Sequence, residues 1–132
     1  MKSIRELLLT LFKGFSEDLN AFRAVESLEI STRTFEIDTS SKTSPQTLLT
    51  PSPGKRLEVR GAFIFSSSTS GEVEVVFPDS NKKVAKIYCS RYYQTQLPKI
   101  KIPGNVGEAL QSQWTELTNN AKIFIVVNYI ET

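Results

Sequence analysis

Apolar residues recur near the start of the chain at the spacing of an amphipathic helix. They lie alternately four and three positions apart, which places them along one face of an α-helix. The stripe consists of Leu8, Phe12, Phe15, Leu19 and Phe22. We therefore predict a helix over residues 2–22, within an N-terminal segment of residues 1–26 that precedes the main domain.

Three roles are open to this helix. It can lie on the domain that follows it, or it can join a short oligomeric bundle, because its spacing is also that of a coiled-coil seam. The third role is a place at a membrane surface. The mixture of acidic and basic residues between the stripe positions argues against that role.

From residue 27 onward the apolar period falls to two, which is the repeat of a β-strand. The alternation predicts strands over residues 28–37, 55–66, 73–77, 84–89, 95–102, 108–115 and 121–130. We expect a bulge or bend at residues 31–33, where the alternation slips, and a long polar connection over residues 38–53. Strands at this spacing, with no helices between them, predict a mainly β fold. The expected form is an antiparallel, jelly-roll-like β-sandwich over residues 27–132.

The last predicted strand is apolar on both of its faces. One face carries Ile123, Ile125, Val127 and Tyr129, and the other carries Phe124, Val126 and Ile130. A strand with one solvent-exposed face alternates between apolar and polar residues, so this strand needs cover on both sides. The core supplies one cover, and the N-terminal helix or a second copy of the chain can supply the other.

The strand over residues 55–66 also carries apolar side chains on both faces. Its alternation predicts one face with Leu57, Val59, Phe63 and Phe65, and an opposite face with Ala62 and Ile64. With the helix stripe and the second face of the last strand, this gives more apolar surface than one sandwich hides. We therefore predict self-association. The expected interface includes Leu8, Phe12, Phe15, Leu19, Phe22, Phe124 and Val126.

The residue inventory offers little for catalysis. The chain has no histidine, which removes the commonest general base and the commonest transition-metal ligand. Its one cysteine, Cys89, forms no internal disulfide and alternates with apolar residues as a core residue does. The carboxylates of Glu72 and Glu74 are expected on the solvent face of a hairpin. We predict that the protein is not an enzyme and holds no cofactor and no metal.

A basic segment without acidic residues runs from residue 80 to residue 107, in a chain of net charge +2. Such a segment either binds an acidic partner or nucleic acid, or protects a sheet edge from aggregation, and we favour the edge role. The alternative function is a carbohydrate- or nucleic-acid-binding module, because tyrosines beside cations stack on sugars and bases. Its binding residues are Arg91, Tyr92, Tyr93, Lys99 and Lys101.

Targeting signals are not evident in the sequence. The apolar run over residues 7–12 is short and follows Glu6, which does not fit a secretion signal. Nothing approaches the roughly 20 apolar residues of a membrane span. We expect no secretion and no membrane span.

Four short motifs are spread over residues 45–131. They are residues 50–57 (TPSPGKRL), 71–75 (GEVEV), 104–110 (GNVGEAL) and 127–131 (VNYIE). In this layout the chain resembles small β-sandwich structural proteins of tailed phages, archaeal viruses or proviruses. The resemblance implies a domain that decorates or joins virion parts, as a trimer or another closed oligomer, and it carries over no catalytic residue.

The resemblance also implies where such a protein is found. Its place is the virion or the cytoplasm of a microbial host, with other virion proteins as partners and nucleic acid as a less favoured one. From the residues and the resemblance together we predict a non-enzymatic, self-associating structural protein.

Overall fold

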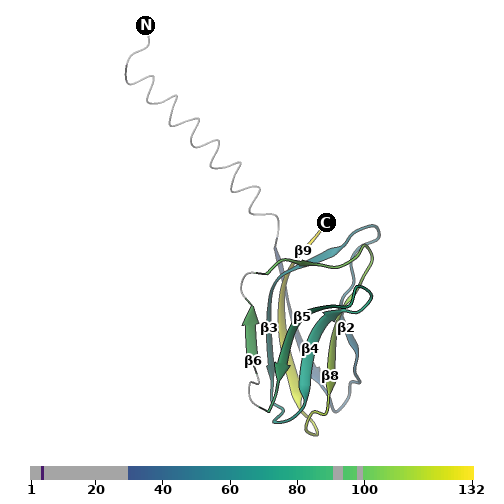
Figure 1. The fold of residues 1–132 in the computed structure, drawn as a ribbon, viewed down its shortest axis with the longest axis vertical. Helices are drawn as coiled ribbons and strands as arrows, with labels where there is room; N and C mark the ends of the chain where they lie inside the picture. The colour runs from purple at the N-terminus through teal and green to yellow at the C-terminus, as the bar shows by residue number, and fades with distance from the viewer. Residues whose placement is uncertain (1–3, 5–29, 91–93, 98–99) are drawn as a thin grey trace.

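The computed structural model describes residues 4, 30–90, 94–97 and 100–132, and nine β-strands lie within these residues (Figure 1). The predicted helix over residues 2–22 and the segment boundary at residue 26 fall, apart from Ile4, outside the described residues. The described part is mainly β, as the alternation predicts.

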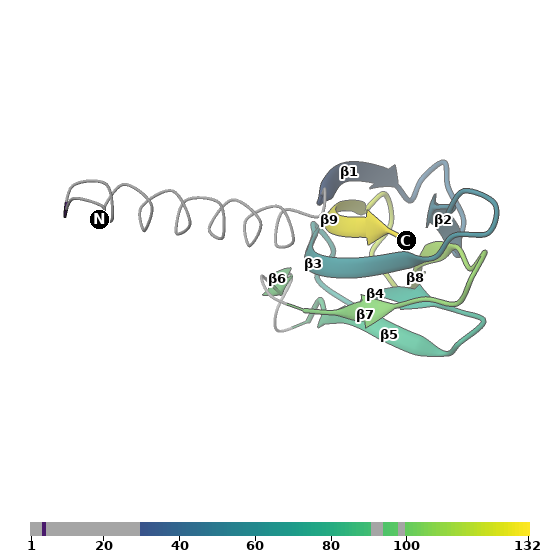
Figure 2. The same ribbon diagram turned by 90° about the horizontal axis from the view of Figure 1, so that it is seen from above.

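The strands form two antiparallel sheets that pack face to face (Figure 2). Sheet I has the order β1-β9-β3-β6, and β7 also pairs with β3. Its strands are β1 (Ser31–Asp38), β9 (Lys122–Glu131), β3 (Leu57–Ser66), β6 (Gln94–Leu97) and β7 (Ile102–Pro103). Sheet II has the order β2-β8-β4-β5. Its strands are β2 (Gln46–Leu49), β8 (Leu110–Thr115), β4 (Glu72–Phe77) and β5 (Lys82–Tyr88).

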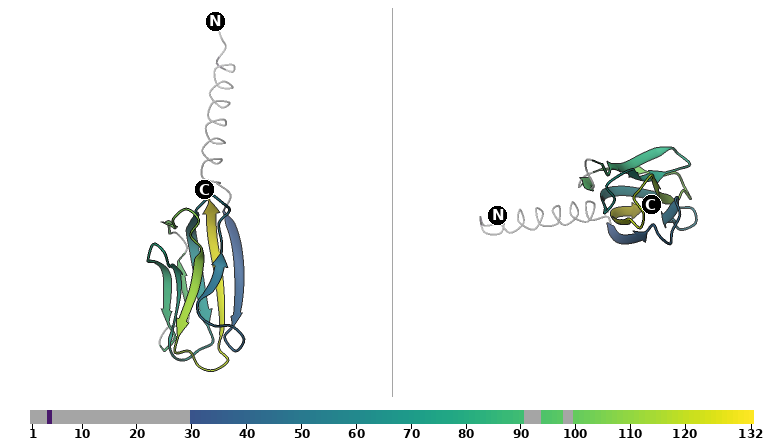
Figure 3. Two further views of the ribbon diagram at one scale, coloured as in Figure 1. Left: turned by 90° about the vertical axis from the view of Figure 1, so that its right-hand side faces the viewer. Right: turned by 90° about the horizontal axis from the view of Figure 1, so that it is seen from below.

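Most connections carry the chain from one sheet to the other, so neighbouring strands are distant in sequence. β1 pairs with β9, for example, with Ser31 opposite Tyr129. The start of β1 and the C-terminus therefore lie at the same end of the sandwich (Figure 3).

The core lies between the sheets and is filled by alternate residues of their strands. Val73, Val75 and Phe77 of β4 are completely buried, and they share one apolar cluster with Ile125 and Val127 of β9. Complete burial of a valine or phenylalanine side chain stabilises a fold by about 1.5–3 kcal/mol. This cluster joins the two sheets into one domain.

A β-bulge in β3 overturns the face assignment predicted for this strand. The register against β9 shifts between Val59 and Gly61, which makes Arg60 the extra residue. A shift of one residue moves every later side chain to the opposite face. Ala62 and Ile64 therefore lie in the core, where they are 5% and 0% exposed, and they add nothing to the outer apolar surface.

Three other predictions differ from the structure. β1 pairs with β9 in unbroken register along its whole length, so the bulge predicted at residues 31–33 is wrong. The polar connection predicted over residues 38–53 contains β2, which pairs with β8. The strand predicted over residues 95–102 is divided into β6 and β7, both paired with β3. Each of these features depends on a partner strand that is distant in sequence.

A buried carboxylate fastens the turn between β4 and β5 to the loop after β7. Glu108 is 2% exposed and accepts hydrogen bonds from the backbone N–H and the hydroxyl of Ser80, at 2.6 and 2.8 Å. The backbone N–H of Asn105 donates a third hydrogen bond at 2.9 Å. Burial raises the pKa of the Glu108 carboxyl, but the hydrogen bonds from Asn105 and Ser80 outweigh burial and lower it overall.

Candidate interaction surface

The outer side of sheet I carries a compact group of apolar side chains from β3 and β9. The bulge at Arg60 turns Phe63 and Phe65 outward, and the register places them opposite Val126 and Phe124, respectively. We call Phe63, Phe65, Phe124 and Val126 the aromatic face. Its members come from two central strands of the sheet, so the backbone that supports it is held on both sides.

The aromatic face is ordered by a contact between two rings. Phe63 and Phe124 meet edge to face, with ring centroids 6.2 Å apart and ring planes at 72°. Phe65 is 37% exposed, and the other three members are half-buried. The aromatic face is therefore an apolar surface that remains partly open to solvent.

A groove of about 610 Å³ adjoins the aromatic face where β1 ends and β9 begins. Its lining includes Phe65, Phe124, Glu36, Asp38 and Lys122. Hydrogen bonds from Ser40, together with the positive charge of Lys122, hold the pKa of Asp38 below its usual value. The groove thus combines an apolar wall with a charged rim.

Polar residues of β1 border the aromatic face on one side. Thr32, Thr34 and Glu36 alternate along this strand and are exposed. The hydroxyl of Thr32 donates a hydrogen bond to Oδ1 of Asn128 on β9, at 2.8 Å. An apolar centre with a polar rim is the usual composition of a protein–protein interface.

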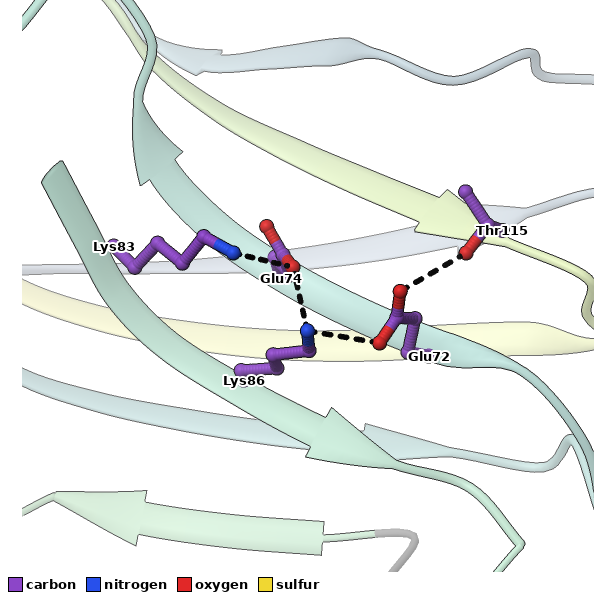
Figure 4. A network of polar contacts seen from close by, with 5 residues as sticks. All are labelled: Glu72, Glu74, Lys83, Lys86 and Thr115. Carbon is purple, nitrogen blue, oxygen red and sulfur yellow. Dashed lines mark hydrogen bonds and ion pairs between the residues drawn. The ribbon is translucent and has the colours of Figure 1, made fainter. Parts of the chain in front are cut away.

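The outer side of sheet II is charged instead. Lys86 on β5 bridges Glu72 and Glu74 on β4 at 2.9 and 3.1 Å, and Lys83 reaches Glu74 at 3.2 Å (Figure 4). Hydrogen bonds to Glu72 and Glu74 raise the pKa of Lys86 well above its usual value. Glu72 and Glu74 point outward from the β4–β5 hairpin, as predicted, and we call these four residues the charge ladder.

The charge ladder and the aromatic face lie on opposite outer sides of the sandwich. The carboxylates of the ladder are already paired with lysines, so their charges are largely satisfied within the chain. Removal of water from the aromatic face, in contrast, lowers the free energy and so favours a contact there. It is therefore the candidate interaction surface.

The structure brings together part of the predicted interface. Phe124 and Val126 belong to the aromatic face, whereas the stripe residues Leu8, Phe12, Phe15, Leu19 and Phe22 lie outside the described residues. Phe63 and Phe65 were not predicted for the interface, because plain alternation assigns them to the same face as Leu57 and Val59. Gly61 is the signal that points to the bulge, since a glycine inside a strand pattern often marks one.

The alternative binding residues fall mostly outside the described part of the chain. Arg91, Tyr92, Tyr93 and Lys99 are not described, and Lys101 is exposed directly before β7. The ligand-binding alternative therefore stays a prediction.

Reactive groups within the described residues are few. Cys89 is 3% exposed, as expected of a core residue, and burial raises the pKa of its thiol. Across residues 30–90, 94–97 and 100–132, no cluster of three or more acidic or cysteine side chains is placed to hold a metal ion. In the same part of the chain, no helix is long and apolar enough to cross a membrane.

The sequence matches no protein-family model and no curated protein. The fold, however, is similar to that of a chain in the acid-stable capsid of the Helicobacter pylori bacteriophage KHP30. The TM-score is 0.57 at 16% sequence identity, and the match covers 78% of this chain and 92% of that chain. This chain therefore shares its fold with a chain of a phage capsid structure.

Two further structures align with lower scores. The core of Drosophila NLP has a TM-score of 0.41 at 12% identity, with 76% of this chain and 98% of that chain covered. A chain of the virus-like particle of extra small virus from the giant freshwater prawn Macrobrachium rosenbergii has a TM-score of 0.39 at 14% identity. That match covers 76% of this chain and 77% of the other. Neither likeness establishes a shared fold at these scores.

Proposed function

We propose that this protein is a non-enzymatic structural component of a virion or provirus particle and that it self-associates through the aromatic face. The observation that carries the proposal is the contrast between the two outer sides of the sandwich. One side leaves Phe65 exposed beside three half-buried apolar residues, while the other pairs its charges within the charge ladder. Apolar patches with polar borders mark protein interfaces on soluble domains.

The likeness to the KHP30 capsid chain supports the virion part of the proposal. At 16% identity the likeness concerns the fold, and one fold hosts many functions. The proposal of self-association therefore rests on the aromatic face and not on this likeness. The orders β1-β9-β3-β6 and β2-β8-β4-β5 support assignment to the jelly-roll class, in which eight strands form two sheets. Viral capsid domains are among the members of that class.

The form of the assembly follows from the resemblance to phage and viral β-sandwich proteins. We favour a closed oligomer, with a trimer as the first choice, located in the virion and in contact with other virion proteins. A closed assembly buries the same surface on every copy and leaves none exposed.

Light scattering during size-exclusion chromatography of the full chain tests self-association. We expect a mass that is a multiple of the 14.8 kDa monomer. The variant Val126→Lys should shift the mass to that of the monomer, because an ammonium group buried in an apolar contact without a partner is costly. Gln113→Lys places the same charge beside the charge ladder and should leave the assembly intact.

The mass of the unmodified chain is the first result to be read. If it remains monomeric at high concentration, the proposed function is wrong. If Gln113→Lys dissociates the assembly as completely as Val126→Lys does, the aromatic face is not the interface.

A further inference from the structure

We propose that the N-terminal segment of one copy occupies the aromatic face of a second copy. The stripe of Leu8, Phe12, Phe15, Leu19 and Phe22 would lie across Phe63, Phe65, Phe124 and Val126 of its neighbour. This inference rests on the proposed self-association and names the surface that meets the aromatic face.

The area that a stable contact needs argues for this occupant. Specific interfaces bury roughly 800 Å² on each partner, drawn from about 20–30 residues a side. Four residues, three of them already half-buried, supply only part of that area if two aromatic faces simply meet. Five large stripe residues from each copy supply apolar area that the described sandwich lacks.

The lengths of the two elements are compatible. A helix rises about 1.5 Å per residue, so the part from Leu8 to Phe22 would be about 21 Å long. The ten residues of β9 extend over about 30 Å, at about 3.3 Å per residue. The stripe therefore fits within the length of the strand that carries Phe124 and Val126.

Described apolar residues near both ends of the segment are exposed, as is one member of the aromatic face. Ile30, where the segment joins β1, is 51% exposed, and Ile4, at the start of the segment, is 77% exposed. Phe65 is 37% exposed in the same molecule. A second copy seated on the aromatic face can cover these apolar side chains as well.

Disulfide trapping between two full-length single-cysteine variants tests the inference. One protein carries Phe12→Cys and the other carries Val126→Cys, both in a Cys89→Ala background. The two are mixed, allowed to exchange subunits and oxidised, and the cross-linked peptides are identified by mass spectrometry. Because each chain has one cysteine, a disulfide between positions 12 and 126 necessarily joins two copies.

Matched variants control for chance collisions. Lys13→Cys replaces a residue between the stripe positions, and Gln113→Cys carries the thiol on the outer side of sheet II. We expect the 12–126 disulfide in severalfold greater yield than the 13–126 or 12–113 disulfide. Circular dichroism of each variant verifies folding, and Phe15→Cys replaces Phe12→Cys if the latter does not fold.

Each result has a distinct meaning. A preferred 12–126 or 15–126 disulfide supports the inference. An assembly that yields only 126–126 disulfides, or no preference over the controls, overturns the inference and leaves self-association standing. A chain that is monomeric by light scattering overturns the proposed function and the inference together.

Discussion

Phe63 and Phe124 meet edge to face across β3 and β9, with their ring centroids 6.2 Å apart, on the outer side of sheet I. The contact exists because the bulge at Arg60 moves each side chain in the second half of β3 to the opposite face of the sheet. Without that extra residue, Phe63 would lie in the core and Ile64 would face outward. A single backbone irregularity therefore creates the surface through which we propose the protein assembles.

A double-mutant cycle on this ring pair measures its contribution. Phe63→Leu, Phe124→Leu and the double variant keep the surface apolar while removing the ring contact. We expect a coupling free energy of about 0.5–1.5 kcal/mol, the usual range for aromatic pairs. Urea unfolding of the four proteins, at one protein concentration, gives the free energies. A coupling within error of zero would show that the rings contribute only by burial.

Glu108 is expected to be the most costly acidic residue to replace among those described. Glu108→Ala leaves the N–H groups of Ser80 and Asn105 without their acceptor, so we expect a loss of about 2–4 kcal/mol in unfolding free energy. The control Glu36→Ala removes an exposed carboxylate and should change stability by about 0.5 kcal/mol or less. Equal effects of the two substitutions would show that Glu108 does not stabilise the contact between the β4–β5 turn and the loop after β7.

The same carboxylate gives stability a defined pH dependence. The pKa of Glu108 is lowered in the folded protein, so near and below pH 4.5 the unfolded chain binds more protons than the folded one. Its contribution is complete above the unfolded pKa and is lost as the pH falls through the lower folded pKa. Unfolding free energies of the unmodified chain and Glu108→Gln, measured from pH 6 downward, should show a steeper fall for the unmodified chain. Parallel curves would exclude Glu108 as a source of the acid sensitivity.

Gly71 is required at its position by close packing as well as by its backbone angle. Its φ is +79°, and a Cβ there would lie 2.1 Å from the carbonyl oxygen of Thr115. Gly107 has the same φ but open space around it, so Gly107→Ala reports the cost of the angle alone. We expect Gly71→Ala to lower the thermal unfolding midpoint by several degrees more than Gly107→Ala does, and similar midpoints would refute the packing argument.

Ser112 offers a substitution that should not harm the fold. Its hydroxyl oxygen is fully buried on β8, and no described group forms a hydrogen bond with it. Ser112→Ala removes a polar group that is costly to bury, so we expect unchanged stability or a gain of about 1 kcal/mol. Urea unfolding measures the difference. The contrasting variant is Ser67→Ala, which should lower stability, because the hydroxyl of the exposed Ser67 accepts a hydrogen bond from the backbone N–H of Lys122. A clear loss in Ser112→Ala would show that the hydroxyl has a partner.

The sequence predicts most of the strands because alternation and turn residues are local signals. Residues 110–115 form a strand within the range predicted, 108–115, and Leu110 and Ser112 alternate into the core. Val73 and Val75 are buried while Glu72 and Glu74 point outward, as their alternation indicates. A pattern of period two is sufficient for these assignments wherever the strand is regular.

β2 could not be predicted in this way. Its four residues sit within a polar stretch, and they become a strand because β8, more than sixty residues later, offers unpaired backbone groups. The burial of Glu108 is likewise invisible locally, since its partner Ser80 lies in a different loop. Such features arise from pairing between distant segments.

By itself, the sequence determined that this protein is a β-rich domain whose last strand is apolar on both faces. That follows from Phe124 and Val126 alternating with Ile123, Ile125 and Val127, which is a property of the chain alone. Only the tertiary structure decided which aromatic residues join Phe124 on the surface. The reason is geometric. One extra residue in β3 moves the side chains after it to the opposite face of the sheet, and pairing with β9 sets the position of that extra residue.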